Sequence, residues 1–81
     1  MISDKEILEV INKAVRNERG KYLNIDSKYT DAELDSLGIT MSLMEIDDKY
    51  DFFKKVGEGQ EVFAKLDIPN LTVRKLVELC K

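Results

Sequence analysis

The sequence has no histidine and no tryptophan, and it has only one cysteine and one proline among its 81 residues. Without histidine, a catalytic triad built on an imidazole base and an ordinary zinc site are both excluded. The single thiol, Cys80, has no partner for a disulfide within the chain. It continues the helical spacing of Val73, Leu76 and Val77, which indicates an apolar filler rather than a nucleophile. We therefore expect that the chain itself is not an enzyme.

Long apolar runs and an excess of basic residues are also missing. No stretch approaches the roughly 18 apolar residues of a membrane span, and the acidic N-terminal segment lacks the pattern of a signal peptide. The formal net charge of −3 disfavours nucleic acid, which is bound through clustered lysine and arginine. These features predict a cytoplasmic, monomeric protein with basic protein partners.

What is present is the composition of a globular domain, with 43% hydrophobic and 36% charged residues. A chain this short buries only about 60% of the surface that its unfolded state exposes, so a deep catalytic cleft would be hard to support. We expect one domain over residues 1–81, with a small core and a function on its surface.

Apolar residues recur at spacings of three and four, which predicts an all-α fold. A first helix from about residue 4 to about 19 begins at a capping box, Ser3 to Glu6, and ends with Gly20 as a left-handed cap. The stripe that runs from Ile39 to Val56 predicts a second helix that ends near residue 56. Either Asp35 or Ser36 is a suitable cap for it, but a rival capping box at residues 42–45 would start its regular part later.

Two shorter helices are predicted after Gly57. One runs from about 60 to 66, and Pro69 prevents its continuation. The other runs from about 73 to 80, with Thr72 as its N-cap. No segment alternates like a strand, so we expect four helices joined by a long first connection.

That first connection, from residue 21 to about 35, has the composition of a loop. A loop of this length in a small domain needs to be held in place. Five apolar side chains are the expected anchors: Tyr22, Leu23, Ile25, Tyr29 and Leu34. We predict substantial burial for Leu23, Ile25 and Leu34.

Charge concentrates in residues 31–51, which hold seven acidic residues and one lysine, a local net charge of −6. The tripeptide Asp35-Ser36-Leu37 lies in this stretch, ahead of the second helical stripe. A serine at a helix start, ringed by carboxylates, is suited to covalent modification by a basic partner enzyme.

Three segments resemble the acyl carrier protein family. They are Asp35-Ser36-Leu37, the acidic and aromatic run at residues 46–50, and the last helix from Thr72 to Leu79. In that family, the serine of an Asp-Ser-Leu motif at the head of helix 2 carries a 4'-phosphopantetheine arm. The resemblance spans nearly the whole chain and implies a four-helix bundle with a long loop between helices 1 and 2.

The register of the motif leaves an alternative open. Family members place a Leu-Gly pair before the modified serine, whereas Leu37-Gly38 follows Ser36 here. A second register treats this pair as the family's loop and makes Ser42, or less favourably Thr40, the acceptor. The segment between helices 2 and 3 also looks longer than usual for the family.

The resemblance implies a carrier of acyl or related thioesters for fatty acid, polyketide or related biosynthesis. Its partners would be a phosphopantetheinyl transferase (holo-acyl-carrier-protein synthase) and acyl-loading and acyl-transfer enzymes with basic docking surfaces. The positions that match the family's docking acids are Asp35, Glu45, Asp47 and Asp48. Four apolar residues are candidates to line a pocket for the acyl group: Met41, Met44, Phe63 and Leu66.

A second hypothesis needs no modification. An unmodified helical interaction module could bind a basic protein through the same acidic face of the second helix. The two hypotheses differ in whether a serine accepts phosphopantetheine.

Overall fold

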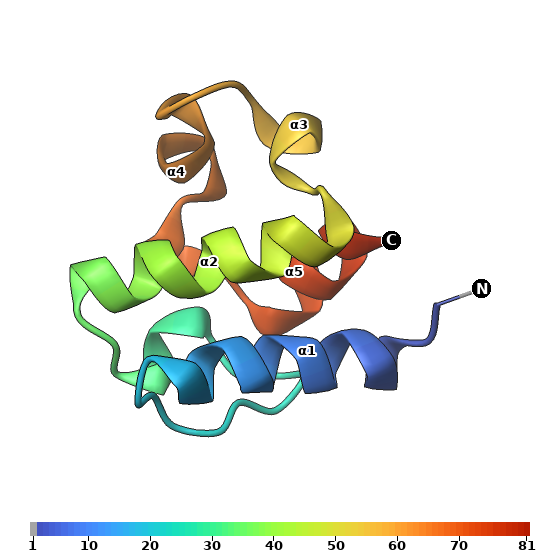
Figure 1. The fold of residues 1–81 in the computed structure, drawn as a ribbon, viewed down its shortest axis with the longest axis vertical. Helices are drawn as coiled ribbons and strands as arrows, with labels where there is room; N and C mark the ends of the chain where they lie inside the picture. Colours follow the sequence, from blue (N-terminus) through green and yellow to red (C-terminus); the bar gives the residue numbers. More distant parts are fainter. Residues whose placement is uncertain (1) are drawn as a thin grey trace.

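A computed structural model describes residues 2–81, and within them the chain is helical (Figure 1). It contains five α-helices, namely α1 (Asp4–Asn17), α2 (Ser36–Tyr50), α3 (Phe53–Val56), α4 (Glu61–Leu66) and α5 (Val73–Cys80). Two short 3-10 segments cover Tyr29–Ala32 and Ile68–Asn70. These residues form no strand, only an isolated antiparallel bridge between Lys28 and Thr72. The predicted all-α fold class is confirmed.

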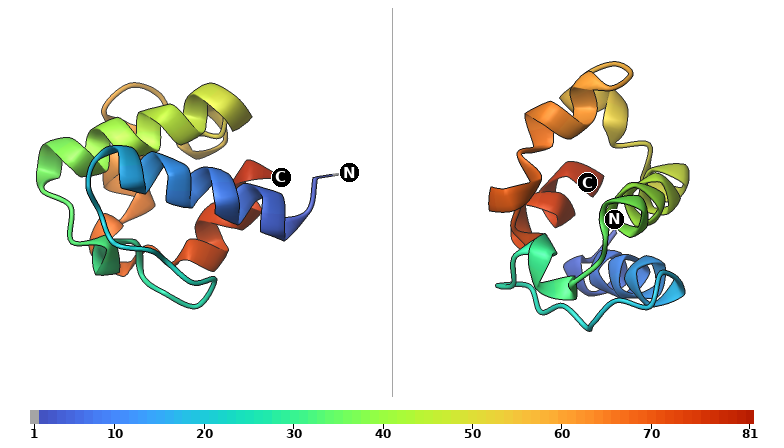
Figure 2. Two further views of the ribbon diagram at one scale, coloured as in Figure 1. Left: turned by 60° about the horizontal axis from the view of Figure 1, so that its bottom comes forward. Right: turned by 90° about the vertical axis from the view of Figure 1, so that its left-hand side faces the viewer.

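Helix α1 packs against α2 and α5. In Figure 1, α1 and α2 lie side by side and run in opposite directions, while α3 and α4 lie beyond α2 on the side away from α1. Figure 2 shows α5 between these parts, where it contributes the predicted apolar face of Val73, Leu76, Val77 and Cys80. None of the helices in residues 2–81 has the length and apolar character needed to cross a bilayer.

The thiol of Cys80 is a core group, as predicted. Cys80 is 3% exposed, and burial raises the pKa of its thiol to about 12. A thiol that stays protonated at neutral pH is a poor nucleophile.

The start of α1 follows the prediction, but its end does not. The Ser3 hydroxyl accepts a hydrogen bond from the Glu6 N–H at 3.2 Å. The helix ends at Asn17, and the left-handed residue beyond it is Arg19, with φ of 65°, instead of Gly20. The Gly20 N–H closes the turn by donating to the Val15 carbonyl at 2.9 Å.

Gly20 is needed for space. A Cβ at this position would lie 2.5 Å from Val15 Cγ1 and 2.7 Å from Leu34 Cδ2. The glycine therefore lets the loop end at Leu34 pack onto the end of α1.

The predicted continuous second helix is wrong, because α2 ends at Tyr50. Asp51 adopts a left-handed conformation with φ of 54°, and the Asp47 carboxylate caps the bend by accepting from the Phe53 N–H at 2.8 Å. The bend turns Phe52 fully into the core. Burying a phenylalanine is worth about 1.5–3 kcal/mol, which exceeds or matches the roughly 1–2 kcal/mol cost of one left-handed residue. The break is why five α-helices form where four were expected.

The two later helices agree with the prediction. Helix α4 begins one residue later than expected and ends at Leu66, as predicted. Helix α5 begins after Thr72, whose hydroxyl accepts from the Lys75 N–H at 3.1 Å.

The loop between α1 and α2 is held largely as predicted. Leu23 is fully buried, and its backbone N–H and C=O both bond to the Asn12 side chain, at 2.7 and 2.9 Å. Ile25 and Leu34 are only partly buried, but both pack against the core. Tyr22 is an error of the prediction, because 72% of it is exposed.

Tyr29 joins this loop to two helices. Its N–H donates to the Leu71 carbonyl at 2.8 Å, and the Val73 N–H donates to the Ser27 carbonyl at 2.9 Å, which ties the loop to the start of α5. Its hydroxyl lies 2.5 Å from the buried Ser42 hydroxyl of α2. Because Ser42 donates to the Ile39 carbonyl at 3.0 Å, the Tyr29 hydroxyl is the donor to Ser42.

We predict opposite effects from two neighbouring substitutions at the end of α1. Gly20→Ala should lower the free energy of unfolding by about 1–3 kcal/mol, because its methyl group overpacks the contact with Val15 and Leu34. Arg19→Gly should raise it by about 0.5–1 kcal/mol, because glycine adopts the left-handed conformation without strain. Urea unfolding of the two variants measures both effects. Equal behaviour would contradict the assignment of the left-handed position.

A second prediction concerns the buried tyrosine. Burial raises the pKa of Tyr29 from 10.0 to about 12, so the neutral hydroxyl stabilises the fold below pH 10 and this contribution is lost as the pH rises toward 12. Tyr29→Phe should cost about 0.5–1.5 kcal/mol at neutral pH and should lose less stability than the parent chain between pH 10 and 12. Denaturant unfolding across this pH range compares them, with Tyr22→Phe as the exposed control. Parallel pH curves for Tyr29→Phe and the parent would show that the hydroxyl titrates in the same way folded and unfolded.

Candidate functional site

Ser36 is the first residue of α2 and is exposed. The preceding residue, Asp35, is the N-cap, and its carboxylate accepts from the Gly38 N–H at 2.7 Å. The Asp35 carbonyl accepts from the Ile39 N–H at 2.9 Å, which makes the first regular helical bond. The helix therefore begins at the Asp-Ser-Leu motif and not at the rival capping box near residue 42.

Gly38 suits the first turn of this helix, although glycine lowers helix propensity by about 1 kcal/mol. A Cβ on Gly38 would lie 3.1 Å from the Asp35 carboxylate and 3.3 Å from Leu34 Cβ. A side chain here would need both neighbours to shift by a few tenths of an ångström, although Glu6 and Lys75 occupy the same position in the caps of α1 and α5.

The geometry at Ser36 fits a covalent phosphodiester. Within the described part of the chain, the backbone N–H groups of Ser36 and Leu37 have no hydrogen-bond partner. Free N–H groups and the helix dipole favour an anion at this end of a helix by roughly 0.3–1 kcal/mol at an exposed position. The Ser36 hydroxyl is open to a modifying enzyme, while the adjacent Asp35 carboxylate is occupied by its capping bond.

The alternative acceptors do not fit in this way. Ser42 is fully buried, and its hydroxyl is engaged by both Tyr29 and the Ile39 carbonyl. The Thr40 hydroxyl donates to the Ser36 carbonyl at 3.0 Å. An enzyme could reach Ser42 only after the helix had separated from the loop.

Three of the four predicted docking acids also have local structural contacts. Asp35 caps α2, half-buried Asp47 caps the bend before α3, and Glu45 accepts a bond from the Asn17 side chain at 2.8 Å. Asp48 is exposed, and no ion pair or hydrogen bond to its side chain occurs in residues 2–81. Asp48 is therefore the acid whose replacement changes charge with the least effect on folding.

The sequence analysis missed an exposed apolar row beside Ser36. Leu37, Met41 and Met44 are 68%, 46% and 50% exposed, and their spacing of four and three residues places them on one side of α2. We call these three residues the α2 ridge. The signal was present in the sequence as a second stripe, offset from the buried stripe that contains Leu43 and Ile46.

The exposure of the α2 ridge shows that the expectation of an acyl pocket lined by Met41, Met44, Phe63 and Leu66 was wrong. Met41 and Met44 are about half exposed to solvent, whereas Leu66 is buried. Phe63 packs edge-on against Phe53, with their ring centroids 5.6 Å apart. The four residues named as pocket lining are therefore not brought together as a single pocket.

A metal site in this chain would be built from acidic or thiol side chains. The described residues include no group of three or more cysteine, aspartate or glutamate side chains placed to hold an ion. Comparison of the chain with protein-family models, with curated proteins and with solved structures gave no match.

Proposed function

We propose that this protein is an acyl carrier protein that carries thioesters on a 4'-phosphopantetheine arm attached to Ser36. The observation that supports this most is the position of Ser36, exposed at the capped start of a 15-residue helix. The arm supplies the reactive thiol, so the chain needs no nucleophile of its own. In this proposal, the fold is a carrier-type bundle in which α3 is an extra turn after helix 2.

The residues around Ser36 have separate tasks in this proposal. Asp35 fixes the start of the helix, which orients the serine hydroxyl outward. The free N–H groups of the first turn stabilise the phosphodiester anion after modification. The Gly38 N–H donates to the Asp35 carboxylate and holds the first turn, so that Ser36 has a fixed position for the transferase.

The exposed side of α2 is the proposed docking surface for the transferase and the acyl-transfer enzymes. The α2 ridge supplies apolar contact area next to the modified serine, and methionine side chains adapt to several partners. Asp48 and Glu45 add negative charge that raises the encounter rate with basic surfaces. Contacts of this kind suit partners that bind briefly and in turn.

The first functional prediction tests the attachment site. Incubation with coenzyme A and a promiscuous phosphopantetheinyl transferase should add the mass of one phosphopantetheine to the parent chain, and Ser36→Ala should abolish the addition. Ser42→Ala should still be modified, although loss of the acceptor for the Tyr29 hydroxyl should destabilise it by about 1–3 kcal/mol. Intact mass spectrometry reads out all three chains.

Two results would contradict the assignment. Modification of Ser36→Ala would place the arm on another residue. A folded parent chain that accepts no phosphopantetheine would favour the unmodified interaction module, which uses the same side of α2.

A further prediction tests whether the acidic side of α2 binds the transferase or is only exposed to solvent. Asp48→Lys should slow modification several-fold at low salt, and the effect should shrink toward 1 M salt, where the Debye length is about 3 Å. Stability should change by less than about 0.5 kcal/mol, because the Asp48 side chain makes no hydrogen bond or ion pair in residues 2–81. The transferase rate measured against salt checks this, with Glu58→Lys, an exposed acid between α3 and α4, as the control. Equal rates for the two variants would remove α2 as the docking surface.

A further inference from the structure

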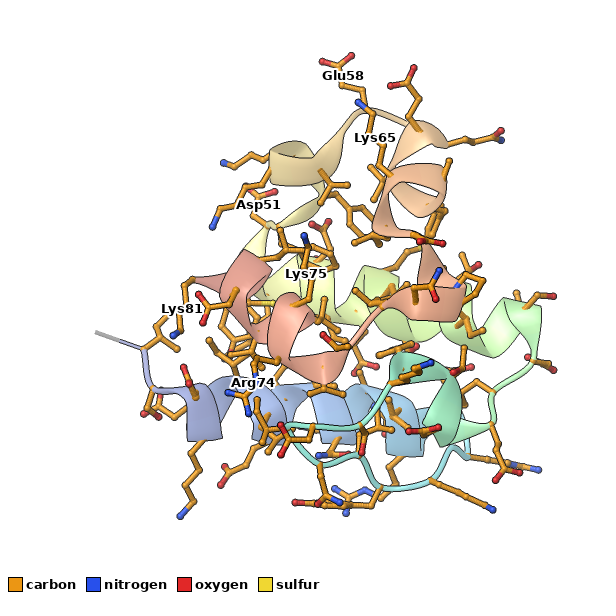
Figure 3. All side chains as sticks on the ribbon, turned by 180° about the vertical axis from the view of Figure 1, so that it is seen from behind. Asp51, Glu58, Lys65, Arg74, Lys75 and Lys81 are labelled. Carbon is orange, nitrogen blue, oxygen red and sulfur yellow. The ribbon has the colours of Figure 1, made fainter. Side chains whose placement is uncertain are left out.

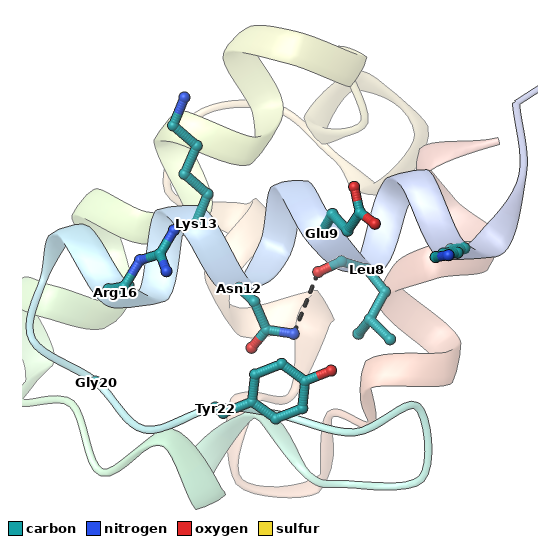
Figure 4. A pocket seen from close by; sticks show the side chains of 8 residues that line it. Leu8, Glu9, Asn12, Lys13, Arg16, Gly20 and Tyr22 are labelled. Carbon is teal, nitrogen blue, oxygen red and sulfur yellow. Dashed lines mark hydrogen bonds between the residues drawn. The ribbon is translucent and has the colours of Figure 1, made fainter.

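We infer that a groove between α1 and residues 20–22 binds an acidic segment of a partner protein, at a site separate from Ser36. The groove has a volume of about 600 Å³. Its lining includes the basic side chains Lys5, Lys13 and Arg16 of α1 and the ring of Tyr22. We call it the α1 groove. In Figure 4 the Lys13 side chain extends away from Tyr22, at the edge of this lining.

The exposed tyrosine is held in a fixed place. On one side of it the Lys21 N–H donates to the Ala32 carbonyl at 2.9 Å, and on the other side Leu23 is fixed by Asn12. Tyr22 itself remains 72% exposed, and Figure 4 shows its ring beneath Asn12, next to the outer side of α1. An aromatic ring on an anchored backbone loses little conformational freedom when a ligand binds.

The charges of the α1 groove are available to a ligand. Lys5, Lys13 and Arg16 form no ion pair among the residues that the structure describes, and Glu9 is the one carboxylate in the lining. Of the ten basic residues outside the groove, Lys21, Lys54, Lys65, Arg74 and Lys81 are paired with carboxylates, and the other five are not paired within residues 2–81. What distinguishes the groove is that three unpaired bases share one lining with a single carboxylate. The groove is thus locally basic in a chain whose net charge is −3.

The span of these charges selects the class of ligand. Lys5 and Arg16 are eleven residues apart on one helix, a rise of about 16 Å. An extended peptide covers this distance with about five residues. The carboxylates of Glu6 and Glu18 lie near the two ends of this span and repel any anionic ligand that extends past it, which favours a short acidic peptide over a longer nucleic acid. The chemistry therefore fits a short acidic peptide segment with an aromatic side chain placed against Tyr22.

The test uses the full unmodified chain, labelled with ¹⁵N, and a synthetic peptide of aspartates around one central phenylalanine. Chemical shifts should change within residues 5–23 and leave the start of α2 unaffected. Arg16→Glu should weaken binding about fivefold at low salt, as expected for reversing one exposed ion pair. Lys75→Glu is the matched control, because Lys75 is also exposed but lies on α5, outside the lining of the groove. Figure 3 shows its side chain at a distance from that of Arg74, which pairs with Asp26 of the loop.

Tyr22→Ala tests the aromatic contact. It should remove the preference of the parent chain for the phenylalanine peptide over the same peptide with alanine at the centre. Circular dichroism should show no loss of helix, because Tyr22 makes no core contact that α1 needs.

Four outcomes would overturn the inference. They are no localised shift change with the peptide, equal weakening by Arg16→Glu and Lys75→Glu, tighter binding of a single-stranded oligonucleotide, and self-association that Arg16→Glu abolishes. The last would assign the groove to the acidic side of a second copy. None of these results depends on modification of Ser36, so the carrier proposal is tested separately.

Discussion

The backbone of residues 18–35 must satisfy its hydrogen bonds outside regular α-helix, and the arrangement of three helices depends on how it does so. A buried N–H or C=O without a partner costs about 1–3 kcal/mol. The Asn12 side chain supplies both partners for Leu23, and the carbonyl of Leu71 supplies one for Tyr29. The first contact fixes the loop to α1 and the second fixes it to α5, while the Tyr29 hydroxyl reaches Ser42 of α2. A single loop thereby adds hydrogen bonds to the apolar packing that α1, α2 and α5 share in one core.

The position of the start of α2 depends on how this loop packs. Leu34 lies close to the places where Cβ atoms on Gly20 and Gly38 would be, so both glycines make room for the same side chain. Once Leu34 is seated, Asp35 is the next residue able to cap a helix, and Ser36 follows in the first turn. The exposure of Ser36 is therefore a consequence of packing two residues earlier. Substitutions at Leu34 or either glycine would move the serine without touching it.

Local signals made much of the fold predictable. Caps and apolar periods gave α5 with its bounds, α4 to within one residue and the start of α1. Features that arise from distant contacts were missed. The break at Asp51 lets Phe52 reach the core. Gly20 is needed because a side chain there would clash with Leu34, not because its backbone is left-handed. Tyr22 is exposed although its neighbours are anchored. At the candidate site, the sequence favoured Ser36 but did not exclude Ser42, since both have helix-start signals. Burial of Ser42 depends on Tyr29, thirteen residues earlier in a segment without periodicity.

The acidic residues of α2 could act in stabilising the fold or in binding a partner. Their individual contacts distinguish these two roles. Each capping or bridging hydrogen bond of Asp35, Glu45 and Asp47 is worth about 0.5–1.5 kcal/mol, so these acids contribute to the fold without any partner. Their charge is not by itself a sign of a partner. The α2 ridge is different, because Leu37, Met41 and Met44 gain little from folding while about half or more of each side chain stays in water. Three such residues on one side of a helix, next to an accessible serine, form an apolar row that the core does not cover. The ridge and not the carboxylates is therefore the stronger reason to look for a partner at α2.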